Sequence, residues 1–169
     1  MRNMVIEAGK VMLLLRYNNY KKTDFIEEHN KVSRKNGYVW MLKAGRKLVE
    51  NKLKNVMEES SIIILKAPKN AGGEYYFTEL LEFRYGKQQE KNDSPEYYAS
   101  LVDDERLWQI DSLDGTWLKI GKIRPLNKQI VDELKLISND KMVQEVVSST
   151  MSSTLYVCVD KDITLSEEV

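Results

Sequence analysis

The chain is poor in the residues that build disulfides and metal centres. Its 169 residues include one cysteine, Cys158, and one histidine, His29. A disulfide within the chain is therefore excluded, as is a metal site made of cysteines or of two histidines. Cys158 lies in the apolar run Leu155–Val159 and is expected to pack as a small buried residue. His29 shares the expected inner face of a helix, which favours a hydrogen-bonded structural histidine over a catalytic one.

The sequence also lacks long apolar runs and phosphate-binding loops. Apolar runs such as Val11–Leu15 are much too short to span a bilayer. Met1–Glu7 has no apolar segment of the kind that secretion signals contain. Neither GxxxxGK[ST] nor GxGxxG occurs, so no dedicated phosphate loop is expected. We therefore expect a cytoplasmic protein with no membrane contact, no cofactor and no bound metal.

The charge is zero overall but uneven along the chain. Lysine plus arginine number 26, and so do aspartate plus glutamate. Residues 1–60 hold 13 basic and 7 acidic side chains, whereas residues 61–169 hold 13 basic and 19 acidic ones. A neutral protein with such a distribution can present a local cationic surface to a polyanion. The alternative is a chance clustering of cations on solvated helix faces.

Periodicity and capping residues predict a mixture of helices and strands. Asp24 followed by Glu27 is typical of a capping box, and Gly37 suits the left-handed position after a helix. A helix is therefore predicted from Asp24 to about Lys35. Further helices are predicted at 46–58, 96–107, 127–137 and 142–147, and strands at 10–18, 38–42, 61–66, 74–85, 115–124 and 155–159.

The order of these elements predicts the fold class. Irregular strand spacing argues against the regular βαβ alternation of a doubly wound sheet. The β-branched run 61–66 is typical of a central strand and is expected to form a hairpin with 74–85, whose odd-numbered positions are apolar except Glu79. Gly121, where the alternation in 115–124 changes phase, predicts a β-bulge. We expect an α+β fold with a small mixed, curved β-sheet or open barrel flanked by helices.

Carboxylates form no convincing catalytic pattern. Glu82-Phe83-Arg84 departs from the Glu-x-Lys of PD-(D/E)xK nucleases, because arginine cannot act as a tunable proton donor. Glu79 is expected to be a hydrogen-bonded carboxylate near a sheet edge. The acidic run 103–105 is expected to be a solvated turn without the spacing of an EF-hand. A binding protein is therefore favoured over an enzyme.

Aromatic and basic residues together favour a nucleic-acid surface. Aromatic rings stack on bases for about 1–3 kcal/mol each, and neighbouring lysines and arginines hold phosphates. Core packing is the alternative for each tryptophan taken singly. The candidate aromatic ligand-binding residues are Trp40, Trp108 and Tyr38, and the candidate phosphate-binding residues are Lys43, Arg46, Lys47, Lys52, Lys122 and Arg124.

Several short motifs lie between residues 37 and 159. They are Tyr-Val-Trp at 38–40, Ser-Ile-Ile-Ile-Leu-Lys-Ala-Pro at 61–68, Tyr-Tyr-Phe-Thr-Glu-Leu-Leu-Glu-Phe at 75–83 and Trp-Leu-Lys-Ile-Gly-Lys-Ile-Arg-Pro-Leu at 117–126. Together they resemble the PUA-like superfamily, which includes the EVE, YTH and ASCH domains. Gly-Arg-Lys-Leu-Val-Glu-Asn-Lys at 45–52 is similar to the ASCH signature G-x-K-x-x-E-x-R, with lysine at its last position.

The resemblance implies a small barrel that binds RNA or DNA. EVE and YTH relatives hold a modified base in an aromatic cage, and Trp40 and Trp108 would be the walls of such a cage here. Lys47, Lys52 and Lys122 would contact phosphates. These roles are implied by likeness of fold, which is a weaker warrant than the geometry of a site.

Three functions stay open at this point. The leading hypothesis is a nucleic-acid-binding module for RNA or DNA, for which recognition of a modified base through an aromatic pocket is one option. The alternative is a protein-interaction factor with a protein partner, such as a small phage or mobile-element inhibitor. An enzyme comes third, either a nuclease or a nucleoside amidohydrolase of the ASCH type, with Lys47 and Glu50 as its catalytic counterparts. One domain is expected, with 1–36 as a strand–helix extension, 37–159 as the PUA-like core and 160–169 as a tail.

Overall fold

The computed structural model describes residues 4–44, 46–69, 74–87, 93–103, 114–147 and 152–165. These ranges hold ten strands and five helices. The strands are β1 (Met4–Ile6), β2 (Met12–Arg16), β3 (Val39–Ala44), β4 (Ile62–Lys66), β5 (Tyr75–Gly86), β6 (Gly115–Ile120), β7 (Arg124–Pro125), β8 (Lys135–Leu136), β9 (Thr154–Cys158) and β10 (Ile163–Leu165). The helices are α1 (Phe25–Asn36), α2 (Glu50–Glu59), α3 (Tyr98–Asp103), α4 (Lys128–Val131) and α5 (Val143–Val146).

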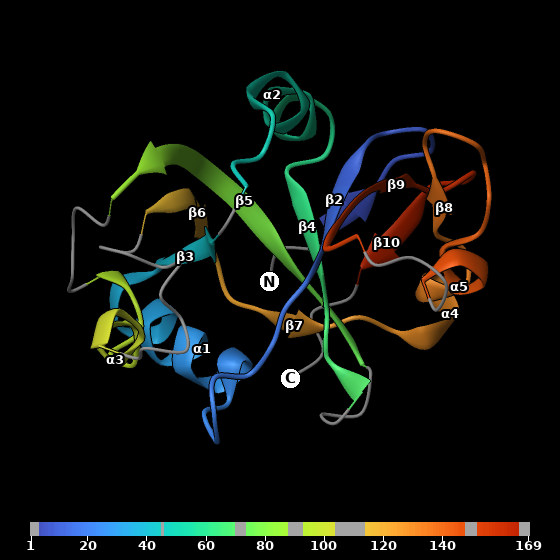
Figure 1. The fold of residues 1–169 in the computed structure, drawn as a ribbon. Helices are drawn as coiled ribbons and strands as arrows, with labels where there is room; N and C mark the ends of the chain where they lie inside the picture. The colour runs from blue at the N-terminus through green and yellow to red at the C-terminus, as the bar shows by residue number, and fades with distance from the viewer. Residues whose placement is uncertain are drawn as a thin grey trace. The chain divides into compact units, whose positions relative to one another are not determined.

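The described strands form a mixed, open β-sheet, which confirms the predicted α+β class. One eight-stranded sheet has the order β3-β6-β5-β4-β2-β9-β8, with β7 paired to β5. β2 and β4 are parallel, while the pairs β2–β9, β3–β6, β5–β6, β5–β7 and β8–β9 are antiparallel. Among the described residues, the terminal strands β3 and β8 do not pair with each other, so the sheet is not closed. Figure 1 shows the long β5 in green.

Contacts along the chain define two compact units. Unit 1 comprises Met1–Asn18, Lys54–Thr78 and Arg124–Val169, and unit 2 comprises Asn19–Leu53 and Glu79–Ile123. β5 contributes to both units, because its residues before Glu79 belong to unit 1 and the rest belong to unit 2.

Unit 1 is built around two short apolar strands. β2 and β4 lie parallel and in register, with Leu14 beside Ile64 and Arg16 beside Lys66. The apolar residues of both strands are buried, as expected for central strands. The core cluster of this unit consists of Ile6, Met12, Leu14, Ile62, Ile64, Tyr75, Phe77, Leu126, Val131, Leu134, Leu136, Val143, Val147, Val157, Val159 and Leu165.

Three residues of the expected C-terminal tail form a strand. β10 pairs antiparallel with β1 in a separate two-stranded sheet, with Met4 opposite Leu165 and Ile6 opposite Ile163. Ile6 and Leu165 are buried in the core of unit 1, and Thr164 is exposed. The alternation Ile163-Thr164-Leu165 is therefore that of a half-buried strand.

Unit 2 contains an antiparallel sheet in which β6 lies between β3 and β5. The predicted bulge at Gly121 is wrong, because β6 ends at Ile120 and the register shift lies in β5 between Leu80 and Glu82. The Gly121 N–H instead donates to the Glu79 carbonyl at 3.1 Å. The phase change in the sequence of β6 therefore marks the end of the strand.

The bulge in β5 changes which residues of that strand face the core. Leu80 lies opposite Ile120, and Phe83 lies opposite Leu118. Ile120 and Leu118 share a face of β6, so the bulge places Leu80 and Phe83 on one face although they are three apart. Leu80 is buried and Leu81 is exposed, so the predicted apolar face of odd-numbered positions is wrong beyond Glu79.

The first helix of unit 2 agrees with its predicted capping residues. Asp24 is the N-cap of α1 and accepts a hydrogen bond from the Glu27 N–H at 3.2 Å. Gly37 takes the left-handed conformation, with φ of 84°, and its N–H donates to the Ser33 carbonyl. Both ends of this helix are therefore determined by local sequence.

The second helix starts later than its periodicity predicts. A helix was expected from Arg46, but α2 begins at Glu50. The Leu48 N–H donates to Thr116 Oγ1 at 3.0 Å, and the Tyr85 hydroxyl donates to the Leu48 carbonyl at 2.7 Å. Because the Leu48 backbone is hydrogen-bonded to side chains of β6 and β5, it is not part of the helix, and α2 begins after it.

The predicted helix at 127–137 is also interrupted by pairing between strands. Asn127 caps α4 as expected, accepting from the Gln129 N–H, but α4 ends at Val131. β8 follows at Lys135–Leu136 and pairs with β9. Ile137 is 44% exposed instead of completing an apolar helix stripe.

Replacing Gly115 with alanine should destabilise the protein by about 1–3 kcal/mol through overpacking. An added Cβ at Gly115 would lie 2.7 Å from the Lys43 backbone oxygen and 3.0 Å from Leu42 Cδ1. Gly121→Ala is the matched control, because its Cβ would meet nothing within 4 Å and should change stability by less than about 0.5 kcal/mol. Urea denaturation of both variants measures the difference, and equal stabilities would contradict the close approach of β3 and β6.

Candidate nucleic-acid interface

One face of the unit 2 sheet carries most of its aromatic and cationic side chains. Trp40 of β3 lies opposite Lys119 of β6, which lies opposite Glu82 of β5. In the next row, Trp117 lies between Leu42 and Arg84. Residues in directly opposed register share a face, as do residues two apart along a strand. We call this side of the sheet the aromatic face; it consists of Trp40, Leu42, Glu82, Arg84, Trp117, Lys119 and the adjoining Tyr38.

Two cations of the aromatic face lie over aromatic rings. Lys119 Nζ is 4.3 Å from the Tyr38 ring centroid, and Arg84 Cζ is 4.1 Å from the Trp40 ring centroid. Such contacts hold a cation in place by attraction to the ring quadrupole. Arg84 Nε is also buried without a hydrogen-bond partner among the described residues. Both cations are therefore positioned beside aromatic rings.

The aromatic residues differ in how open they are to a ligand. Trp40 is 4% exposed and Trp117 is 1% exposed, and both belong to a buried cluster with Tyr98 and Leu101 of α3. The Trp117 indole N–H donates to the Gly86 carbonyl at 2.9 Å. Tyr38 is half-buried, and its hydroxyl donates to Asp93 at 3.1 Å. Arg84 therefore lies over the ring of a tryptophan that is almost fully buried.

On the same side of the sheet as Trp117, His29 belongs to a chain of hydrogen bonds that includes Tyr98. His29 Nδ1 is 2.7 Å from the Phe25 carbonyl, so this nitrogen donates, and Nε2 accepts from the Tyr98 hydroxyl at 2.7 Å. The Tyr98 oxygen accepts from the Leu42 N–H at 3.1 Å. Burial lowers the pKa of His29 from 6.5 to about 4, outweighing the hydrogen bond to Phe25. Its position on the inner helix face therefore agrees with the predicted structural role.

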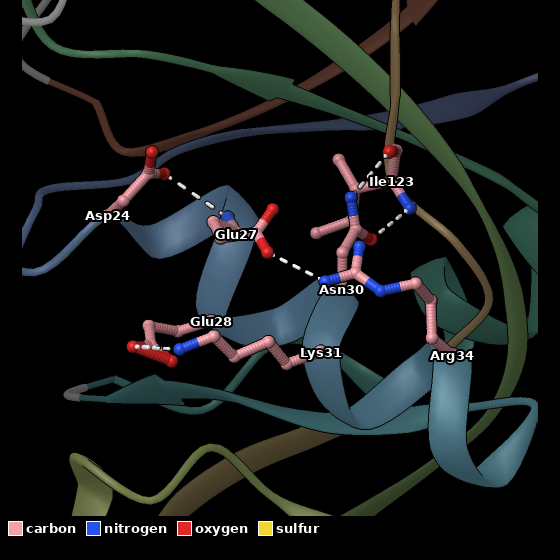
Figure 2. A network of polar contacts seen from close by, with 7 residues as sticks. All are labelled: Asp24, Glu27, Glu28, Asn30, Lys31, Arg34 and Ile123. Atoms are coloured by element: carbon pink, nitrogen blue, oxygen red, sulfur yellow. Dashed lines mark hydrogen bonds and ion pairs between the residues drawn. The ribbon is translucent and has the colours of Figure 1, made fainter. Parts of the chain in front are cut away.

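Helix α1 holds the segment that contains Lys122. The Asn30 side-chain amide donates to the Ile123 carbonyl at 2.9 Å and accepts from the Ile123 N–H at 2.8 Å (Figure 2). Both residues are buried, so this pair satisfies backbone groups that would otherwise lack partners. Lys122, next to Ile123, is exposed.

The cations of α1 in Figure 2 are paired with acids of the same helix. Lys31 lies 3.2 Å from Glu28, and Arg34 lies 2.6 Å from Glu27. Pairs as exposed as these contribute little to stability. They nevertheless lower the net charge of α1, so this helix adds little to a cationic surface.

The predicted phosphate-binding residues do not gather at one place. Lys43 lies opposite Thr116 near the end of the sheet at Gly115, whereas Lys122 follows the other end at Ile120. These ends are roughly 15 Å apart at the rise of an antiparallel strand. The remaining candidates of unit 2 are exposed at the β3–α2 connection and on α2, namely Arg46, Lys47 and Lys52.

Two of the candidate phosphate-binding residues, Lys43 and Lys47, already interact with other groups of the protein. Burial lowers the pKa of Lys43, whose ammonium donates to the Ala44 carbonyl at 3.1 Å. Lys47 lies 3.8 Å from Asp114. Arg124 lies in β7 of unit 1, opposite Phe77, and Trp108 lies outside the described residues.

The sequence prediction left two positioned cations, Arg84 and Lys119, out of its phosphate-binding set. The alternation of residues along a strand predicts which face of the sheet Arg84 or Lys119 occupies. It does not predict which aromatic ring of a neighbouring strand each cation contacts. The register of β3, β6 and β5 decides this. The sequence signal that could have identified them is a lysine or arginine close to aromatic residues within one strand, as in Phe83-Arg84-Tyr85 and Trp117-Leu118-Lys119.

Metal-ligating side chains do not cluster in the described part of the chain: no three histidine, cysteine, aspartate or glutamate side chains in these ranges gather as a metal site would. Glu79 is half-buried. No helix in the described part of the chain is long and apolar enough to cross a membrane.

Comparisons with protein-family models, with curated proteins and with solved structures found no match for this chain. The geometry of the aromatic face is therefore the basis for a functional proposal.

Proposed function

We propose that this chain is a nucleic-acid-binding module of PUA-like architecture, and that the aromatic face of unit 2 contacts the ligand. The observation that carries the proposal is the pair of cation–ring contacts, Lys119 over Tyr38 and Arg84 over Trp40. Single-stranded nucleic acids are bound by cations that follow the backbone together with rings that stack on bases. The mixed, open sheet supports the architecture.

Within this proposal, the cations and the rings have separate roles. Lys119 and Arg84 attract phosphates, and Lys122 adds charge beside the segment held by Asn30. Tyr38 is the more exposed of the two rings, with Lys119 over it, whereas recognition of a modified base by Trp40 requires Arg84 to move away from the indole. Glu82 lies beside Lys119 in register and opposes the approach of a phosphate.

A protein partner has less support on the described surface. The exposed large apolar residues of unit 2 are Val49 and Leu81. Val49 lies just before α2, and Leu81 lies at the bulge of β5. Singly scattered apolar residues are normal on soluble proteins. No observation on the described residues therefore favours a docking surface for a protein.

Replacing Lys119 with glutamine should weaken nucleic-acid binding about fivefold and lower the salt slope by about 0.7–0.9, as expected for one lost phosphate contact. Glu82→Gln should strengthen binding, because it removes a negative charge beside the same lysine. Fluorescence anisotropy with labelled single- and double-stranded RNA and DNA, at two salt concentrations, measures both effects.

Lys31→Gln is the matched control, because Lys31 is an exposed lysine already paired with Glu28. It should leave binding unchanged. An absence of salt-sensitive binding by the wild type would overturn the proposal. Equal losses in Lys119→Gln and Lys31→Gln would show that charge is spread over the unit and would remove the aromatic face as the site.

A further inference from the structure

Two cations end the parallel strands of unit 1. Arg16 and Lys66 are the last residues of β2 and β4, and they lie side by side in register. The same face carries Leu14 and Ile64 further back along the strands, both in the unit 1 core. The apolar face of β2 and β4 is therefore followed, at the carboxyl ends of the strands, by two adjacent positive charges. Ligands of open sheets commonly bind beyond the carboxyl ends of parallel strands.

Two buried polar atoms beside these cations lack partners. The hydroxyl of Tyr75 has no hydrogen-bond partner among the described residues, and Tyr75 is only 8% exposed. Arg16 Nε is likewise buried and unpartnered, while its terminal NH₂ donates to the Val147 carbonyl. Buried polar groups are nearly always hydrogen-bonded, so these two atoms have an unused hydrogen-bonding capacity that a ligand would satisfy.

The positive charges of Arg16 and Lys69 repel that of Lys66, which lies beside Tyr75. Lys66 Nζ lies 5.6 Å from the Tyr75 ring centroid and makes one long hydrogen bond, of 3.4 Å, to the Ala67 carbonyl. Burial lowers the pKa of Lys66, and the charges of Arg16 and Lys69 lower it further. Burial raises the pKa of the Tyr75 phenol, against the effect of Arg16. Within the described residues, no carboxylate forms an ion pair with any of the three cations.

We propose that Arg16, Lys66 and the Tyr75 hydroxyl form a binding site for a phosphate group, either free or as a phosphate monoester. A phosphate would accept hydrogen bonds from Arg16 Nε, from the Lys66 ammonium and from the Tyr75 hydroxyl, and its charge would offset the repulsion among the cations. The site belongs to unit 1, shares no residue with the aromatic face of unit 2 and does not depend on the function proposed there.

Calorimetric titration at constant ionic strength should show saturable binding of inorganic phosphate and of uridine 5′-monophosphate by the full chain. Tyr75→Phe and Lys66→Gln should each weaken that binding about tenfold, because each removes a hydrogen bond to a charged group. Tyr76→Phe is the matched control on the adjacent strand position, where the hydroxyl donates to Glu74 at 2.9 Å, and it should leave binding unchanged. A tighter interaction with the nucleotide than with phosphate would identify a monoester as the ligand, and equal affinities would identify free phosphate.

Stability without phosphate provides an independent readout. Because the Tyr75 hydroxyl lacks a partner, Tyr75→Phe should leave the unfolding midpoint unchanged or raise it. Phosphate should raise the midpoint of the wild type and not that of Lys66→Gln. The proposal is overturned if neither probe binds the wild type, if acetate binds as tightly as phosphate, or if Tyr75→Phe lowers stability without phosphate.

Discussion

Lowering the pH from 7 to 5 should reduce the free energy of unfolding by about 2 kcal/mol through His29 alone. The pKa of His29 is lowered by burial to about 4 in the folded chain, against 6.5 ordinarily. Between these two values, the unfolded chain binds a proton that the folded chain does not. Stability therefore rises with pH across this window, and His29 contributes its full stabilisation above pH 6.5. Acid removes it because the protonated ring cannot accept the Tyr98 hydrogen bond.

His29 is the only histidine, which makes the test direct. NMR titration of its ring should show no protonation in the folded protein down to about pH 5. Urea denaturation of His29→Gln should lose most of the pH dependence between 7 and 5, where most carboxylates stay ionised. A ring that titrates near 6.5 in the folded protein would contradict the buried network with Phe25 and Tyr98.

Replacing Leu80 with alanine should destabilise the protein by about 2–5 kcal/mol, whereas Leu81→Ala should change its stability by less than about 0.5 kcal/mol. Leu80 is 1% exposed and lies opposite Ile120, while Leu81 is 39% exposed at the bulge of β5. The two substitutions are chemically identical and adjacent in the chain. Their difference therefore reports only which face each leucine occupies.

Denaturant unfolding of the two variants, followed by circular dichroism, measures this difference. Regular alternation along β5 would reverse the order, because Leu81 would then share the buried face of Tyr75 and Phe77. A larger loss in Leu81→Ala than in Leu80→Ala would therefore place the register shift elsewhere. Equal losses would contradict the bulge as well.

Features that depend on neighbours in the sequence were predictable from the sequence. Helix α1 has the expected limits because Asp24 and Gly37 bond to groups within one turn. The buried strands β2 and β4 follow from dense runs of apolar residues, which have no stable place except a core. His29 could be placed on the inner face of α1 by its spacing from Phe25. The α+β class follows from these elements together.

Pairing between distant segments decided the rest. The bulge in β5, the late start of α2 and the strand β8 each arise because hydrogen bonds to another strand outweigh local periodicity. The same holds for the candidate sites. Lys119 meets Tyr38, and Arg16 meets Lys66, only through strand register. By itself, the sequence determined the local elements and the fold class, since propensity and apolar spacing act over a few residues. The tertiary structure determined which charges meet, since long-range register has no local signal.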